Sequence, residues 1–519
     1  MEFSLALNRQ GVACGGQLTT SGNPKFLSVP WRISAVSFPN RCGCATAQLK
    51  YNIKASLQAA ETTPIYVGDN LRCNKPNKVK LFVGLPLDVV SGNQTINHSK
   101  AIAAGLKALK LMGVEGVELP VWWGIVEDKA MGKYDWSGYL TIIEMVRDAG
   151  LKLHVTLSFH SSSSSKINLP SWVTELGESQ PDIYFKDRAG RHFKGCLSLA
   201  TDDLPILHSK SPSQVFRECA ESFKSTFETF MGSTIAGITM GLGPEGELKY
   251  PSHHKPQKDG KTIGTGEFQC YDKYMLSLLK KQAEEAGNPL WGLGGPHDAP
   301  TYDASPDSTN FFKNQNGSWE TPYGTFFLSW YTNELINHCD RLLSMAESVF
   351  NECPVNIYGN VPLVHSWFGT RSHASELTAG YFNVDGRDGY DKVAEIFAKN
   401  KCKMVIGGWD LVEPGGSEAR PEMVLDQIRS ACDRHGVGIA GRNAMIAGKG
   451  LEQIRGNLGC AAAEVFVYER MGAEFFSPEH FPAFTQFVRS LSSPETHSDD
   501  LPDVKEGSVS KVNPQLQVA

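Results

Sequence analysis

The feature that most constrains the fold is an alternation of β-rich and helical segments that begins at Lys78. Short runs rich in aliphatic and aromatic residues recur eight times, and amphipathic stretches follow them. This order is typical of parallel strands joined by helical crossovers. The runs are Val79–Leu87, Gly116–Trp122, Leu151–Phe159, Thr234–Met240, Val355–His365, Met404–Leu411, Gly436–Ala440 and Ala463–Tyr468.

The helical periodicity is clear over Ala101–Met112, where apolar residues recur at helical spacing. Eight β runs, each followed by helix, predict a (β/α)8 TIM barrel whose long βα loops form a cleft at the C-terminal face of the strands. A doubly wound sheet is the alternative, but no glycine-rich dinucleotide fingerprint follows the first strand. Further helices are expected over Asp388–Lys399, Pro421–Arg434, Gly450–Leu458 and from Glu479 to about Ser493.

Composition divides the chain of 519 residues into three parts. Residues 1–77 are expected to be a transit peptide and disordered leader, because their first 60 positions hold six basic residues against the single acid Glu2 and no long apolar stretch. A disordered leader without a targeting role is the alternative. Residues 78–493 are expected to form the barrel, and 494–519 a disordered acidic tail.

Charge and cysteine spacing exclude several kinds of protein. A formal net charge of −6 and the lack of a basic helical segment before the barrel argue against nucleic-acid binding. No run of about 18 apolar residues is present, so no membrane association is expected. Only Cys42 and Cys44 are closely spaced, and they lack the partners that a metal site needs. We therefore predict no metal.

Candidate chemistry lies where the strands end, as in barrels of this type. The fourth run is followed by a glycine-rich segment that carries Glu245 and Glu247. Flat apolar faces beside polar groups suit sugar rings, although ordinary loop packing explains such residues too. The aromatic residues near the strand ends are Trp122, Trp123, Trp367, Phe368, Trp409 and Tyr468.

At this point the sequence resembles a known family, the plant β-amylases. These are inverting glycoside hydrolases with a (β/α)8 barrel that release maltose from the non-reducing ends of α-1,4-glucans, without a cofactor. The resemblance covers roughly residues 78–492. It rests on the motifs Val121-Trp-Trp-Gly-Ile-Val-Glu127, Leu157-Ser-Phe-His160, Gly241–Ser252, His373-Ala-Ser-Glu-Leu-Thr-Ala-Gly380 and Phe466-Val-Tyr-Glu-Arg-Met471.

The resemblance implies that one half of the catalytic pair is retained and the other is lost. An inverting glycosidase needs one carboxylic acid to protonate the leaving oxygen and one carboxylate to activate water. The family's acid falls on Glu247. The family's base, in a Gly-Glu-Asn-Ala motif, falls on Arg442 of Gly441-Arg-Asn-Ala444. Arginine stays protonated and has no acceptor, so it cannot act as the base.

Other sugar-contacting positions of the family are expected to be altered in this chain. Pro120 takes the place of an aspartate, Asn360 that of a lysine and Gly407 that of a threonine. The family's mobile lid is reduced to the short polar segment Ser161–Lys166. The sugar-binding positions that match the family are His160, His365, Asn443, Ala444 and Arg470.

These departures predict a catalytically inactive, or nearly inactive, β-amylase homologue of the plastid stroma. Its expected role is regulation or sugar sensing in starch degradation, with α-1,4-glucan or maltose as ligand or another starch-degrading enzyme as partner. One alternative is a weak or altered β-amylase, for which Asp410 is the only nearby carboxylate that could substitute as base. The other is an interaction scaffold without a sugar ligand.

Overall fold

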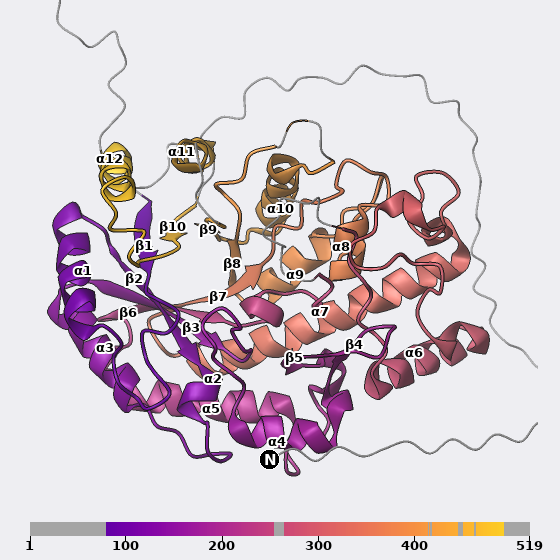
Figure 1. The fold of residues 1–519 in the computed structure, drawn as a ribbon, viewed down its shortest axis with the longest axis horizontal. Helices are drawn as coiled ribbons and strands as arrows, with labels where there is room; N and C mark the ends of the chain where they lie inside the picture. Colours follow the sequence, from indigo (N-terminus) through magenta and orange to yellow (C-terminus); the bar gives the residue numbers. More distant parts are fainter. Residues whose placement is uncertain are drawn as a thin grey trace, which may run out of the picture. The chain divides into compact units, whose positions relative to one another are not determined.

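A computed structural model describes residues 79–253, 264–413, 415, 418–444, 450–460 and 463–492. The predicted leader and acidic tail lie outside these residues. Eight parallel strands close into a barrel in the order β1-β10-β9-β8-β7-β6-β3-β2 (Figure 1), which confirms the predicted fold class. The barrel strands are β1 (Lys80–Gly84), β2 (Gly116–Trp122), β3 (Lys152–Ser158), β6 (Ile235–Met240), β7 (Asn356–Val361), β8 (Lys403–Ile406), β9 (Ile439–Arg442) and β10 (Val465–Tyr468).

Helices surround the barrel and pack on one another in sequence around it, with α5 against α7, α7 against α9, α9 against α10, and α12 against both α11 and α1. They are α1 (Ser99–Met112), α2 (Trp123–Val126), α3 (Ser137–Asp148), α4 (Ser171–Ser179), α5 (Pro212–Thr226), α6 (Lys273–Glu285), α7 (Pro322–Phe350), α8 (Ala374–Ala379), α9 (Asp391–Lys399), α10 (Pro421–His435), α11 (Gly450–Cys460) and α12 (His480–Ser492).

Local sequence explains where several of these elements begin and end. A capping box between Ser211 and Gln214 starts α5. Gly113, with φ of 86°, ends α1 in the left-handed conformation that glycine adopts without strain. The apolar side of each strand packs on the helices, whereas a smaller cluster fills the barrel. The members of that cluster are Phe82, Tyr358, Val405, Ala440, Val465 and Val467.

All eight predicted β runs contain strands, but four of them have a boundary that was wrong by three residues or more. The run from Val79 stops at Gly84 and not at Leu87. The run expected at Gly436–Ala440 is shifted to β9 because Gly436, with φ of 67°, still belongs to the end of α10. The run from Met404 stops at Ile406, since Gly408 turns the chain with φ of 74°. The run from Val355 stops at Val361, and Pro362 follows. The two-stranded hairpin of β4 (Tyr184–Lys186) and β5 (His192–Leu197) was not predicted.

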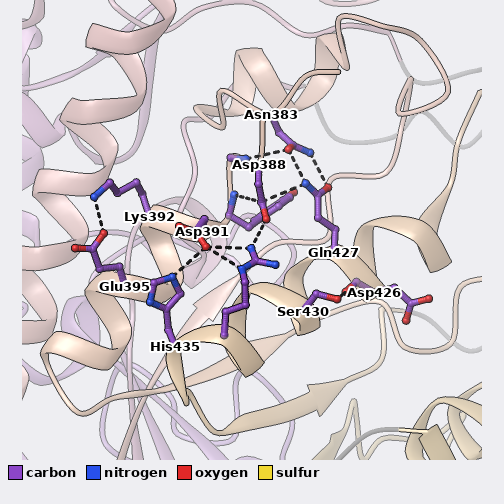
Figure 2. Close-up of polar contacts among 12 residues, drawn as sticks. Asn383, Asp388, Asp391, Lys392, Glu395, Asp426, Gln427, Ser430 and His435 are labelled. Atoms are coloured by element: carbon purple, nitrogen blue, oxygen red, sulfur yellow. Dashed lines mark hydrogen bonds and ion pairs between the residues drawn. The ribbon is translucent and has the colours of Figure 1, made fainter. Parts of the chain in front are cut away.

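A polar network fixes the segment that follows α8 (Figure 2). Asn383 and Gln427 exchange two side-chain hydrogen bonds of 2.9 and 2.8 Å, which tie this segment to α10. Asn383 also donates to the fully buried Glu376 of α8. At the outer end of the network, His435 lies 3.0 Å from Asp391 of α9. The segment between α8 and α9 is therefore tied to α8 and to α10, and α10 is tied to α9.

Candidate active site at the carboxyl ends of the strands

The centre of the candidate site is a contact that crosses the interior of the barrel. Arg442 ends β9 and Glu118 lies in β2, and β10 and β1 separate these two strands in the sheet. The side chains still meet, because Arg442 Nη2 lies 3.0 Å from Glu118 Oε1. Thr156 of the neighbouring β3 donates to the same oxygen at 2.6 Å. Both charged side chains must therefore point into the barrel.

The segment after β10 supplies the second carboxylate around Arg442. Arg442 Nη1 lies 2.8 Å from Glu469 Oε1, and Arg470 Nη2 lies 3.2 Å from the other oxygen of Glu469. Arg470 also donates from Nη1 to the carbonyl oxygen of Leu85, at 2.5 Å. Two cations and two carboxylates therefore alternate in one chain of contacts from Glu118 to Arg470.

The opposite charges in this series of contacts stabilise one another in their ionised forms. Burial alone would raise the pKa of Glu118, but Arg442 and Arg470 outweigh burial and the pKa is lowered. Burial alone would lower the pKa of Arg442, but Glu469, Glu118 and Glu247 outweigh it and the pKa is raised. Arg442 is therefore a fixed cation, and it lies close enough to Glu247 to interact with its charge.

Glu247 lies in the turn after β6, as predicted. The turn includes the 3-10 segment Pro244–Gly246, in which Glu245 has a left-handed φ of 57°. Lys249 donates from Nζ to Oε2 of Glu245 at 2.6 Å and to Oε2 of Glu247 at 2.7 Å. Burial would lower the pKa of Lys249, but Glu247 and Glu245 outweigh it and raise the pKa. Glu247 therefore has a permanent cation as a direct partner.

Two positions that the resemblance marks as altered lie beside Glu247. The backbones of Asn360 and Glu247 form a parallel β-bridge, and the N–H of Leu248 donates to the carbonyl oxygen of Asn360 at 2.9 Å. The Asn360 side chain is 4% exposed, and its Oδ1 has no hydrogen-bond partner among the described residues. A Cβ at Gly407 would have Glu247 Oε1 as its nearest neighbour, at 3.9 Å. A larger group at position 407 would therefore approach the Glu247 carboxylate.

The two candidate sugar-binding histidines are neutral at pH 7. Burial lowers the pKa of His160 to about 4 and also lowers the pKa of His365. The His160 ring packs edge-on against Trp122, with 5.2 Å between centroids, and lies near Gly246 of the Glu247 turn. Neither histidine finds a hydrogen-bond partner for Nδ1 among the described residues. In each histidine one ring nitrogen is therefore buried without a hydrogen-bond partner among the described residues.

The serine segment expected in place of a lid is held by backbone hydrogen bonds. Ser161 donates to the carbonyl oxygen of Gly195 in β5 at 2.7 Å. Ser162 and Ile167 exchange two backbone hydrogen bonds of 2.7 and 2.9 Å. The segment is thus a short closed loop attached to the β4–β5 hairpin.

Asn443 and Ala444 connect the ends of two strands. Asn443 donates to the carbonyl oxygen of Glu469 at 2.9 Å and accepts from its N–H at 2.7 Å, so it fixes the segment that carries Glu469. Ala444 donates its N–H to Asp410 Oδ1 at 2.7 Å, and Asp410 is buried. The carboxylate nominated as a substitute base therefore accepts a backbone hydrogen bond from the chain just after Arg442.

The predicted site residues form two adjoining groups. Arg442, Asn443 and Arg470 meet around Glu469, whereas His160, Asn360 and Gly407 lie around the Glu247 turn. Two predicted residues lie apart from these contacts. Pro120, in β2, pairs in register with Thr156 and offers no polar group, and the backbone carbonyl of His365 accepts from Arg420 at 3.1 Å.

Sequence reasoning missed three charged residues of the site. Asp410 was the carboxylate nominated as a substitute base, and Glu118 and Glu469, which both contact Arg442, were not considered. Lys249, the direct partner of Glu247, was missed as well. A signal for Glu118 was present, since an acid in an otherwise apolar strand requires a buried partner. The sequence could not name that partner, which lies 324 residues away.

The lowered pKa of Glu118 predicts how stability depends on pH. A carboxyl group whose pKa is lower in the folded state contributes stability above its unfolded pKa, near 4.5 here, and loses it as the pH falls further. The melting temperature of Glu118→Gln should therefore lie below that of the parent at pH 7 and approach it below about pH 4. Burial raises the pKa of Glu127. The loss of melting temperature caused by Glu127→Gln should therefore grow, and not shrink, as the pH falls. Thermal unfolding between pH 3.5 and 7 checks both.

The closed barrel carries its acidic turn and its ion-paired arginine at the carboxyl ends of the strands, the end at which barrel enzymes form their active sites. The family model of glycosyl hydrolase family 14 matches residues 82–496. The chain therefore belongs to family 14, the β-amylase family. The catalytic domain of β-amylase from Paenibacillus polymyxa has the same fold, with a TM-score of 0.67 and 24% identity over 81% of this chain and all of that one.

Curated relatives in plants differ in what their names say of activity. The chain is 56% identical to "Inactive beta-amylase 9" of Arabidopsis thaliana over 429 residues, which cover 81% of this chain and 79% of that protein. It is 40% identical to "Beta-amylase 1, chloroplastic" of Oryza sativa over 435 residues, which cover 81% of each chain. Membership of the family therefore does not establish whether this chain has amylase activity.

Two features are absent from the residues that the structure describes. No group of three or more His, Cys, Asp or Glu side chains there is arranged to hold a metal ion. No described helix combines the length and apolar character needed to cross a membrane.

Proposed function

We propose that this chain is a family 14 protein without appreciable amylase activity that regulates starch degradation by sensing glucan or maltose. One observation carries the proposal: the guanidinium of Arg442 is ion-paired to Glu118 and Glu469 where the resemblance expects the general base. An inverting mechanism needs a carboxylate there to take a proton from water. A guanidinium has five donors and no acceptor, so it cannot take that proton.

The remaining carboxylates at the site do not replace the base. Both oxygens of Glu469 are in ion pairs, and Asp410 accepts the N–H of Ala444. Glu118 is 2% exposed and bound to Arg442. Each of these carboxylates is therefore already engaged by another group of the protein. The geometry therefore favours the inactive form over the weak or altered hydrolase.

Sugar sensing is supported by what the site keeps. His160 and His365 are neutral and each has a ring nitrogen without a partner among the described residues. Trp122, which packs on His160, lies at the end of β2 near the mouth of the barrel. The expected location is the plastid stroma, given the basic composition of the leader and relatives that are named chloroplastic.

Isothermal titration of the full chain with maltose and maltotetraose tests the sensing role. We expect saturable heat at millimolar sugar. We also expect about tenfold weaker binding for His160→Ala, because one hydrogen bond to a buried group is worth roughly 1.4 kcal/mol. The exposed substitution His297→Ala is the matched control and should leave the titration unchanged. No heat at millimolar sugar would rule out the sensing role and leave a protein partner.

A further inference from the structure

The alternating charges of the site join parts of the barrel that are far apart in the sequence. We call Glu118, Arg442, Glu469 and Arg470 the latch. Its contacts run from β2 to β9, to the segment after β10, and to the carbonyl oxygen of Leu85 after β1. These four strands are consecutive in the barrel in the order β2-β1-β10-β9. The latch therefore spans the place where the first and last strands pair to close the barrel.

The latch is mostly removed from solvent and electrically balanced. The side chain of Glu118 is 3% exposed, and those of Arg442, Glu469 and Arg470 are 18, 21 and 23% exposed. Two cations face two carboxylates, so the four charges cancel. Removing one partner of such a buried pair leaves a charge without compensation and is strongly destabilising, whereas removing both can be nearly neutral.

The backbone of β1 fits closely around the latch. A Cβ at Gly84 would lie 3.3 Å from Glu118 Oε2 and 3.3 Å from both Cβ and Nη1 of Arg470. That spacing is tighter than most real Cβ contacts, so the latch fills the space beside this strand. Glycine at position 84 leaves room for the two charged side chains.

We propose that Arg442 is a structural residue of the barrel and that Glu118 is the partner on which it depends. In this view the arginine does more than remove a catalytic group, because it closes the barrel by pairing across its interior. This role of Arg442 concerns the stability of the folded barrel and goes beyond the proposed function. It holds whether or not the site binds sugar.

A double-mutant cycle on the full chain tests this proposal through melting temperatures at one fixed heating rate and pH 7. Glu118→Gln and Arg442→Met should each lower the melting temperature by about 5–10 °C. The first leaves two cations facing Glu469 alone, and the second removes the ion-pair partner of the buried Glu118. The double variant should fall clearly less than the sum of the two losses, because no unpaired charge remains between them. A double variant whose loss equals the sum would overturn the proposal.

A matched pair controls for general damage to the barrel. Glu127 is buried and accepts a hydrogen bond from Trp123 Nε1 at 2.6 Å, and its partners among the described residues lie outside the latch. Losses from Glu127→Gln and Arg442→Met should therefore add. If the single latch variants do not yield soluble protein, the solubility of the double variant is measured in place of its melting temperature. A soluble Glu118→Gln/Arg442→Met protein supports the proposal, and an equally insoluble one contradicts it.

Discussion

Replacing Arg442 with glutamate is expected to give a protein that releases no more than traces of maltose and melts about 10 °C below the parent. The new carboxylate would face Glu118 and Glu469 with no cation between them, whereas the native guanidinium lies 3.0 and 2.8 Å from their oxygens. Like charges in a buried site cost several kcal/mol. A glutamate at position 442 therefore removes both ion pairs of Arg442. It leaves the altered positions Pro120, Asn360 and Gly407 unchanged.

Thermal unfolding and maltose release, measured side by side, check this prediction. Arg455→Glu makes the same charge change at an exposed position of α11 and should shift the melting temperature by no more than about 2 °C. Brisk maltose release by Arg442→Glu would show that the rest of the pocket is intact, against our account of a generally altered site.

Substituting Asp202 by asparagine should have an effect of similar size, although Asp202 lies outside the latch. Asp202 is 4% exposed, and its Oδ2 accepts from His338 Nδ1 at 2.7 Å and from Arg341 Nη2 at 2.7 Å. His338 Nε2 lies 3.0 Å from the carbonyl oxygen of Leu242, in the turn that carries Glu247. Breaking one partner of a buried pair costs about 3–5 kcal/mol, which corresponds to a melting temperature roughly 5–10 °C lower.

The adjacent residue supplies the control for that experiment. Asp203 is 68% exposed and lies 3.6 Å from Arg341, so Asp203→Asn should change the melting temperature by no more than about 2 °C. Equal losses for the two variants would show that the buried contacts of Asp202 with α7 do not stabilise the turn after β6.

The sequence was informative about the barrel because strand and helix periods repeat eight times along the chain. Boundaries failed where single glycines decide the backbone, as at Gly408 and Gly436, whose positive φ values end one element and delay another. The β4–β5 hairpin was not predicted because its β5 strand, His192–Leu197, is partly exposed and carries polar residues, which gives no clear apolar alternation.

The candidate site was predictable only where local motifs carry it. Glu247 and Arg442 lie in short motifs, and the structure places both at the carboxyl ends of barrel strands. Their partners could not be read in the same way. Glu118 pairs with Arg442 through the interior of a closed barrel, and that contact depends on the register of β2 and β9 across two intervening strands. Long-range charge pairing of this kind follows from the closed fold and leaves no local pattern.

The most direct test of the proposed function is maltose release from maltoheptaose by the full chain, beside an active β-amylase at equal concentration. Our account predicts no product above a heat-killed control after a long incubation, because Arg442 is a cation held between Glu118 and Glu469. Release of maltose in the β configuration would contradict it. That result would mean that another group activates water and that Arg442 contacts the substrate.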